Sequence, residues 1–452
     1  MQFGDNRLGG SEGLALHTVN GSIHQLFSYE YDAGGHLVAA VDAAGFAQRW
    51  YYDMDGRLAR QVGRDGGVFH YRYDSRGRCV FRSGLNHYDE KRIRYLDATR
   101  ITEVIDSYGE TRRYQYLPSG QVIAEWDPLG AVKRTEFDAF GRVAARIDAL
   151  GGTTRFGYDA TGNRDRLIDA LGRETRLTFN ASHQPLSWTD PLEQTWSRIY
   201  DARNRLIAAQ DPAGQRWCFR RDEQGNLVEI VNPMGAVKRQ RFTQGVLEAI
   251  TDWMGHETNF IHDDFGRLLE RVGPQGDSTR MRYDVIGRCI QVALADGASL
   301  SASYDHAGNM TSFVDALGHT TRWRFGPCSR LLERVDGLGQ GVRFVWGSEP
   351  GRLDQLINER REAYSFERDA AGRIVKEVSF DGSLREFRYD ASGEIVGWMN
   401  ADGEVVTICR DALHQVVAQI LPDGEAQEFV FDAVGRLAAA REGGRTGTFE
   451  RG

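Results

Sequence analysis

Hydrophobic and polar residues alternate along most of the chain, in segments of roughly six residues. After Gly66, for example, the apolar side chains fall at Phe69 and Tyr71, with His70 and Arg72 between and after them. A period of two residues is that of a β-strand, because successive side chains of a strand point to opposite faces of the sheet. No long stretch follows the helical period. The pattern therefore predicts an all-β protein made of short strands.

The alternating segments belong to a repeat that runs almost from end to end. Twenty anchor positions, sixteen of them aromatic, follow one another from Tyr31 to Phe431, and sixteen of the nineteen intervals are 21 residues long. The residue after the anchor is Asp in 14 cases, and the residue four after it is Gly in 13. We take the following residues as the structural signature of the repeat: Tyr52, Asp53, Gly56, Arg57, Tyr73, Asp74, Gly77, Phe137, Asp138, Gly141, Arg142, Tyr158, Asp159, Gly162, Tyr283, Asp284, Gly287, Tyr304, Asp305, Gly308, Tyr389, Asp390, Gly393, Phe431, Asp432 and Gly435.

A second Asp-x-x-Gly signal lies about ten residues beyond each anchor, at Asp127, Asp148, Asp169 and Asp315 among others. Asp at the first position of a type I turn caps backbone N–H groups, and Gly accepts the positive φ that follows the turn. Each unit therefore holds two chain reversals and two strands. Strands joined by such short turns are antiparallel neighbours, so the chain is predicted to form one long zigzag ribbon.

The size of this ribbon limits its shape. About 40 strands at ~4.8 Å spacing give a ribbon ~190 Å long and ~20 Å wide. Native twist forbids a flat sheet of that length, so we expect an antiparallel strand ribbon coiled into a spiral β-shell or cocoon segment. A sphere of the same area would enclose only about 50–60 residues, so we expect an open or spiral part of a shell. A propeller is the disfavoured alternative, because adjacent half-units are equivalent.

Composition and charge narrow the function classes. The chain has 452 residues, of which 41% are hydrophobic and 27% charged, as in a globular protein. The net charge of −8 gives no reason to expect a nucleic-acid partner. No apolar stretch has the ~20 residues of a membrane span, and the first ten residues do not resemble a secretory signal peptide. The 52 Gly and only 10 Pro are typical of many tight turns.

The sequence offers no group of residues that we would assign to chemistry. The five Cys are scattered without metal-ligand or disulfide-framework spacing, and the Asp-Gly turns do not have the period of calcium-binding repeats. Nothing resembles a nucleophile motif. We therefore predict no catalytic residues, no cofactor, no metal site and no enzymatic activity. The Arg that often follows the turn Gly, as at Arg57 and Arg142, indicates a structural Arg–Asp ladder, with an anion- or sugar-binding strip as the alternative.

Repeated YDxxGRL with an intervening DPLGxxT, as in residues 148–167, resembles the YD repeat of the bacterial Rhs family, over Tyr31 to Leu437. The resemblance implies a middle section of a non-catalytic Rhs shell that encapsulates a C-terminal toxin domain for delivery to competing cells. Its implied partners are the remaining parts of a longer Rhs chain, including the toxin domain, and secretion-system spike proteins. It also implies synthesis in the cytoplasm of a bacterium and secretion without a signal peptide. The alternative is a cell-surface module that binds carbohydrate or protein.

The repeat divides the chain into three parts. We expect an irregular N-terminal lead-in at residues 1–30, a repeat region of about 20 units at 31–443, and the truncated start of a further repeat at 444–452. Three stretches depart from the pattern, at residues 84–100, 242–247 and 346–364. We interpret them as bulges or longer loops, with contact of one of them with a partner domain as the alternative.

Overall fold

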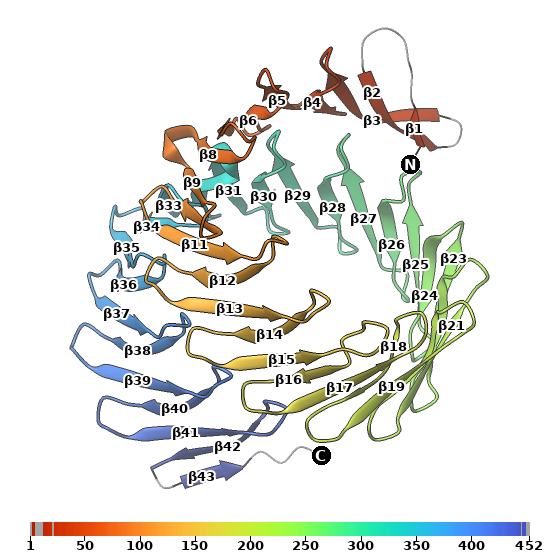
Figure 1. The fold of residues 1–452 in the computed structure, drawn as a ribbon. Helices are drawn as coiled ribbons and strands as arrows, with labels where there is room; N and C mark the ends of the chain where they lie inside the picture. Colours follow the sequence, from red (N-terminus) through yellow and green to blue (C-terminus); the bar gives the residue numbers. More distant parts are fainter. Residues whose placement is uncertain (1, 5–11, 20–21, 444, 449–452) are drawn as a thin grey trace.

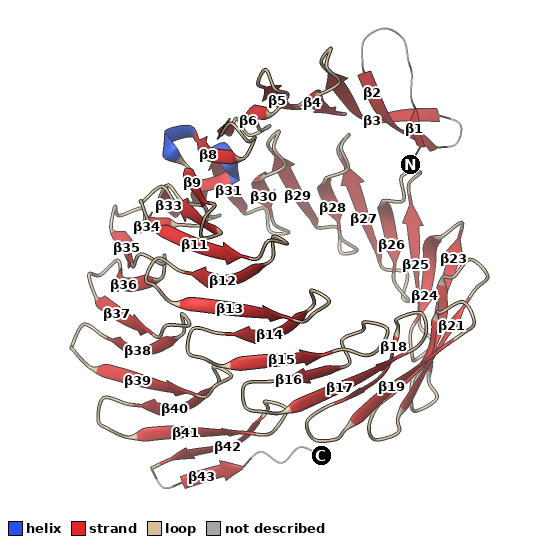
Figure 2. Cartoon of the chain, viewed as in Figure 1, coloured by secondary structure: helices blue, strands red, loops and turns tan. Residues whose placement is uncertain are grey.

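The computed structural model describes residues 2–4, 12–19, 22–443 and 445–448, and in these residues it is almost entirely β-structure (Figure 2). All 43 strands belong to one sheet. Each strand pairs antiparallel with the next strand along the chain, from β1 with β2 to β42 with β43. The only helical segments in the described part are two 3₁₀ turns, η1 (Leu85–His87) and η2 (Pro327–Ser329). The prediction of an antiparallel all-β ribbon is confirmed.

The strands are short and regular, mostly of five or six residues. Those of the first coil, which we define as residues 27–262, and of the segment before it are β1 (Gln2–Gly4), β2 (Glu12–Val19), β3 (Ser22–Tyr31), β4 (Leu37–Asp42), β5 (Ala47–Tyr52), β6 (Leu58–Val62), β7 (Val68–Tyr73), β8 (Cys79–Gly84), β9 (Lys91–Leu96), β10 (Ile101–Ile105), β11 (Thr111–Tyr116), β12 (Val122–Trp126), β13 (Val132–Phe137), β14 (Val143–Ile147), β15 (Thr153–Gly157), β16 (Arg166–Ile168), β17 (Glu174–Phe179), β18 (Pro185–Thr189), β19 (Thr195–Tyr200), β20 (Leu206–Gln210), β21 (Arg216–Arg221), β22 (Leu227–Val231), β23 (Val237–Thr243), β24 (Val246–Thr251) and β25 (Glu257–His262).

The strands of the second coil, residues 263–443, and the last strand are β26 (Leu268–Val272), β27 (Ser278–Tyr283), β28 (Cys289–Ala293), β29 (Ser299–Tyr304), β30 (Met310–Val314), β31 (Thr320–Gly326), β32 (Arg330–Val335), β33 (Gly341–Trp346), β34 (Leu353–Ile357), β35 (Ala363–Arg368), β36 (Ile374–Val378), β37 (Leu384–Tyr389), β38 (Ile395–Met399), β39 (Val405–Arg410), β40 (Val416–Ile420), β41 (Ala426–Phe431), β42 (Leu437–Glu442) and β43 (Arg445–Thr448). The expected lead-in thus contains β1, β2 and most of β3. Of the expected further repeat, only β43 lies within the described residues.

The ribbon winds into an open spiral of more than one full turn (Figure 1). In Figure 1, strands β11–β16 of the first coil, coloured orange to yellow, run beside the blue strands β35–β41 of the second coil. In the described part, β1 pairs only with β2 and β43 only with β42, so the sheet does not close into a barrel. The twist that accumulates between neighbouring strands requires this coiling.

The two faces of the ribbon differ in chemistry. In β7, for example, Phe69 and Tyr71 lie on one face, and His70 and Arg72 on the other, where they are exposed. Among the residues that the structure describes, only six hydrophobic residues are buried, and five of them are alanines such as Ala145. Ala145 lies on the charged face, where its neighbours across the strands are Glu136 and Arg155. The described part of the chain therefore has no central core, and contacts along the ribbon and between its coils set the shape.

Candidate functional site: the repeat turns and the seam between coils

Each repeat contributes two turns, one to each edge of the ribbon. The turns that follow the aromatic anchors form one edge, which we call the anchor edge. In a representative anchor turn, Asp53 Oδ1 accepts hydrogen bonds from the N–H groups of Asp55 (3.0 Å) and Arg57 (2.9 Å), and Asp53 Oδ2 accepts one from Arg57 Nε (2.9 Å). Gly56 lies between them with φ of 74°. The carboxylate thus satisfies the backbone of the turn and also orients the Arg.

The anchor residues join each repeat to the one before it. The hydroxyl groups of the six signature tyrosines donate to backbone carbonyl oxygens fifteen residues earlier, at 2.6–2.9 Å, as from Tyr52 to Leu37 and from Tyr158 to Val143. The Arg of the preceding turn stacks on the same ring, with the Arg142 guanidinium 4.3 Å from the centre of the Tyr158 ring. Asp, Gly, Arg and Tyr therefore act as one unit that fixes the spacing of successive repeats.

The structure places all the predicted signature residues in this arrangement. Their glycines have φ between 74° and 96°. Their aspartates accept hydrogen bonds from the N–H groups two and four residues later. Asp390 is the exception among them, because it accepts only from the N–H group four residues later, that of Glu394. Phe137 and Phe431 lack the hydroxyl group that the tyrosines use.

Positions that lack the turn Gly keep its conformation. His183, Asn204 and His414 stand where the pattern has Gly, and their φ angles are 60–63°. A positive φ is sterically unfavourable for a residue with a Cβ atom, and Asn is among the residues that tolerate it best. At residues 242–247, the missing residue produces a tight hairpin in which Gln244 and Gly245 have φ of 51° and 81°. The backbone of the repeat is therefore more regular than its sequence.

Hydrogen bonds fix the protonation of the turn groups. The backbone N–H of Arg57 is the largest cause that lowers the pKa of Asp53 below 3.8. In the turn of Asp159, the side-chain amide of Asn163 is the largest cause, and the pKa falls to about 2. Burial raises the pKa of the Tyr283 hydroxyl above 10. Asp53 and Asp159 are therefore charged acceptors, and Tyr283 is a neutral donor, at neutral pH.

The second set of turns, which we call intermediate turns, forms the other edge of the ribbon. In the first coil, intermediate turns between residues 42 and 173 meet anchor turns of the second coil between residues 265 and 436. We call this line of contact the seam. It includes hydrogen bonds from Ser329 to Asp65 (3.4 Å), from Arg173 to the Asp432 carbonyl oxygen (3.0 Å), and between His414 Nε2 and Asp148 Oδ2 (3.2 Å). These contacts give the spiral its wall.

The densest part of the seam is a polar cluster that we call the clasp. It consists of Lys91, Ser107, Tyr108, Ser348, Glu349 and Arg352. Glu349 Oε1 accepts hydrogen bonds from the N–H (2.9 Å) and hydroxyl (2.6 Å) of Ser107, and its carboxylate also pairs with Lys91. The Ser348 N–H donates to the Tyr108 hydroxyl (3.0 Å), and Arg352 stacks 3.6 Å from the centre of the Tyr108 ring. The clasp thus joins two segments 240 or more residues apart.

In the clasp, the negative charge of Glu349 faces the positive charge of Lys91. Burial raises the pKa of Glu349, but the hydrogen bonds from Lys91 and Ser107 outweigh burial and hold the pKa below 4.5. Glu349 is therefore charged at neutral pH and pairs with a cation across the seam. Most clasp residues lie in or beside the irregular stretches 84–100 and 346–364. The sequence marked these stretches as departures, but it gave no sign that the two would meet each other.

The described residues contain no group of three or more His, Cys, Asp or Glu arranged to hold a metal ion. The five cysteines are free thiols. No helix in the described ranges is long and apolar enough to cross a membrane. What the arrangement does supply is a set of rigid, repeated polar contacts. Such contacts can hold the strands and coils of a wall in place.

Comparison with known proteins agrees with this architecture. Solved structures that resemble the chain include that of TcdB2-TccC3, with a TM-score of 0.60, 13% identity, and coverage of 96% of this chain and 32% of that chain. A structure of the Photorhabdus luminescens Tc holotoxin pore has a TM-score of 0.50 and 14% identity, and the match covers 95% of this chain and 26% of that chain. This chain therefore spans about a third or less of the length of these neighbours. At such identities the likeness shows the fold alone.

Sequence families give the more specific result. The search of curated proteins found no match. The family described as RHS Repeat matches residues 262–299. The family described as Teneurin YD-shell matches residues 15–246, just over half of the 452 residues. With the repeat turns and the coiled ribbon described above, this match shows that the chain is a shell-forming YD-repeat protein and belongs to the Teneurin YD-shell family.

Proposed function

We propose that this chain forms part of the wall of a non-catalytic, Rhs-type shell that encloses a toxin polypeptide for delivery into competing cells. The seam is the observation that carries the proposal, because it turns an open ribbon into a continuous wall. The names of the structural neighbours, a Tc toxin complex and a holotoxin pore, support a toxin as the enclosed guest. We further propose the division at residues 30 and 443 as the limits of the wall-forming repeats.

The dimensions of the coil indicate what state the guest would have. Seam partners are 240 to 266 residues apart in sequence. Such a coil contains about 25 strands, with a circumference of ~120 Å and a mid-sheet radius of ~19 Å. Inward side chains reduce the lumen radius to ~14 Å. A folded domain of ~100 residues has a radius of gyration of ~13 Å and therefore an outer radius of ~17 Å, so it is too wide to fit. The guest would therefore lie in the lumen as an extended or unfolded chain.

The other parts of the proposal concern synthesis and partners. The guest would be encoded in the same chain or in a companion chain, and the remaining parts of a longer Rhs protein would complete the shell. The assembly would be made in the bacterial cytoplasm, leave without a signal peptide, and engage spike proteins of a secretion system. The family match supports a structural role, since the families found are built from shell repeats.

Protease protection tests the proposal. The chain is produced together with the polypeptide encoded immediately downstream, and the purified product is digested with a non-specific protease. We expect the guest to survive in the intact assembly and to be digested after denaturation. We also expect it to be digested faster when the clasp is opened by Glu349→Ala with Lys91→Ala. Glu229→Ala, which removes a carboxylate that pairs with Arg220 and Arg239 of the same coil, is the matched control and should leave protection unchanged. Equal digestion of free and co-purified guest would overturn the proposal.

A further inference from the structure

The seam covers only part of the intermediate-turn edge. Along the seam, anchor turns of the second coil lie against β10–β13 of the first coil, and clefts remain between the two coils. Val104 and Arg112 line a cleft of about 300 Å³ with Glu349 and Arg352, and Lys133 lines the next with Arg373. Beyond residue 173 the edge continues, and among the described residues no hydrogen bond or ion pair joins its turns to another coil. We call its turns at residues 190–194, 211–215, 232–236, 252–256, 273–277, 294–298, 315–319 and 336–340 the free margin.

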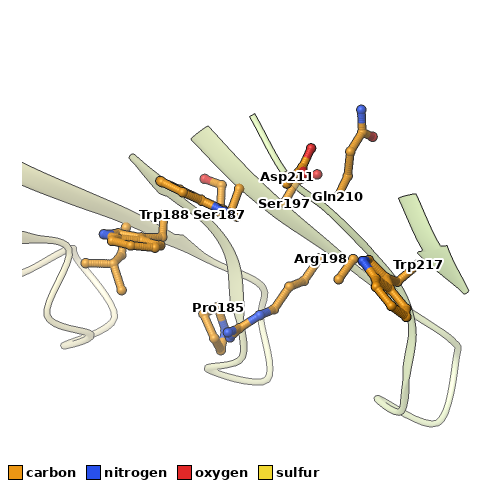
Figure 3. A pocket seen from close by; sticks show the side chains of 11 residues that line it. Pro185, Ser187, Trp188, Ser197, Arg198, Gln210, Asp211 and Trp217 are labelled. Atoms are coloured by element: carbon orange, nitrogen blue, oxygen red, sulfur yellow. The ribbon is translucent and has the colours of Figure 1, made fainter. Parts of the chain in front are cut away.

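Beside the first turns of the free margin, aromatic residues occupy the positions that line the clefts along the seam. Trp188, Trp196, Arg198 and Trp217 line a cleft of about 650 Å³ there (Figure 3). The Trp188 and Trp196 rings stack at 4.2 Å, and Trp217 meets Trp253 edge-on at 5.9 Å. Three of these indoles remain exposed: Trp188, Trp217 and Trp253.

Strand register shows that this cleft is the counterpart of the covered ones. Trp196 and Trp217 are the second residues of β19 and β21, as Arg112 and Lys133 are the second residues of β11 and β13. Trp188 is the fourth residue of β18, as Val104 is of β10. The aromatic cleft therefore continues the line of the seam into repeats that no second-coil turn reaches.

The turns of the free margin carry several large apolar side chains that are exposed. Leu150 and Leu171 occupy the third position of seam turns and are 57% and 47% exposed. At the same position of free-margin turns, Leu317, Leu338, Met234 and Met254 are 81–93% exposed, whereas Leu192 in the first of these turns is 40% exposed. The two neighbouring pairs, Met234 with Met254 and Leu317 with Leu338, are apolar surface of the kind that marks an interaction site.

We propose that the free margin docks the anchor edge of the first coil of a second copy of this chain, which continues the spiral. The same chain carries both halves of such a contact. Its first-coil anchor turns have no cover among the described residues, and they present Met54 and Phe140, which is 83% exposed. Both edges have the same repeat spacing, so turns that match once match along the whole margin. The inference rests on the seam alone and does not require an enclosed guest. It concerns this chain by itself, because the remaining repeats of a longer Rhs chain would compete with a second copy for the same margin.

A contact between two different edges is heterologous, so copies add head to tail and each end stays open. We therefore expect oligomers that grow with concentration in sedimentation velocity and light scattering. On association, the tryptophan emission should shift to shorter wavelength as Trp188 and Trp217 are covered.

Two double variants test the proposal. Leu317→Asp with Leu338→Asp removes the margin, and Met54→Asp with Phe140→Asp removes the complementary edge. Each should weaken self-association about tenfold or more while the far-UV spectrum stays unchanged. Mixed in equal amounts, the two variants should form dimers and nothing larger, because only one productive contact remains. Val345→Asp, on the charged face of β33, is the control and should associate normally.

The proposal has clear contrary outcomes. A wild-type protein that stays monomeric up to its solubility limit would overturn it. So would oligomers that persist in both double variants, since their contacts would then lie elsewhere. A failure here leaves guest protection in the shell assay unaffected, so the two proposals are separable.

Discussion

The same four residues, Asp-Ala-Leu-Gly, form a turn at residues 148–151 in the seam and at 315–318 on the free margin. In both, the Asp carboxylate accepts from the Leu N–H at 2.9 Å, and the Gly φ angles are 91° and 85°. Their surroundings differ: Asp148 pairs with His414 of the second coil, whereas Asp315 pairs with His319 of its own turn. The turn is thus encoded locally, and its cover is a consequence of winding.

The largest effect is expected where winding brings charges together. Glu349→Ala removes hydrogen bonds to Ser107 and leaves Lys91 without its partner across the seam. Charge-assisted hydrogen bonds of this kind are worth about 2–3 kcal/mol together. We expect a loss of that size by thermal or urea unfolding, with faster hydrogen exchange confined to β8–β11 and β33–β34. Glu229→Ala, away from the seam, should cost less than ~1 kcal/mol. Equal losses would show that the clasp adds nothing.

A turn glycine should matter equally in both regions. At Gly151 and Gly318 a Cβ would meet no atom within 4 Å, so substitution adds only backbone strain. Gly151→Val and Gly318→Val should each cost about 1–3 kcal/mol through the positive φ. Differential scanning calorimetry of the two variants checks this. A cost at Gly151 much greater than at Gly318 would mean that the seam also constrains the turn backbone.

Acid should open the seam before it melts the turns. The folded-state pKa of Glu349 is lowered, so its stabilisation is fully present above 4.5 and is lost as the pH falls through the folded value. The turn carboxylate of Asp159 has a pKa of about 2 and keeps its contribution to lower pH. Hydrogen exchange at the clasp should therefore rise below pH 4.5, before exchange in the Asp159 turn. In Glu349→Gln, exchange at the clasp should no longer change over this range. An unchanged pH response in that variant would exclude Glu349 as the titrating group.

The features that could be predicted from the sequence are those encoded locally, and the features that could not are those that depend on winding. The Asp-x-x-Gly turns, the strand period and the coiling were predictable, because they depend on neighbours in sequence and on twist. The pairing of Lys91 with Glu349 was not, because it depends on how many strands fill one coil. That number is the sum of small twists over about 25 strands, and no motif carries it. The irregular stretches 84–100 and 346–364 were the nearest signal, and each was expected to bulge rather than to bind the other.

The smallest expected effect isolates the cover itself. Leu150 and Leu317 have the same neighbours in sequence and the same turn geometry, so replacing each with Ala removes the same atoms. Leu150 is 57% exposed and Leu317 is 82% exposed, and the apolar area that this difference represents is worth about 0.5–1 kcal/mol. Leu317→Ala, which uncovers almost nothing in a single copy, should be close to neutral at low protein concentration. At high concentration it should become costly if a second copy covers the margin. The difference between the two variants, measured by urea unfolding across a range of protein concentrations, therefore gives the stability that winding adds to one turn.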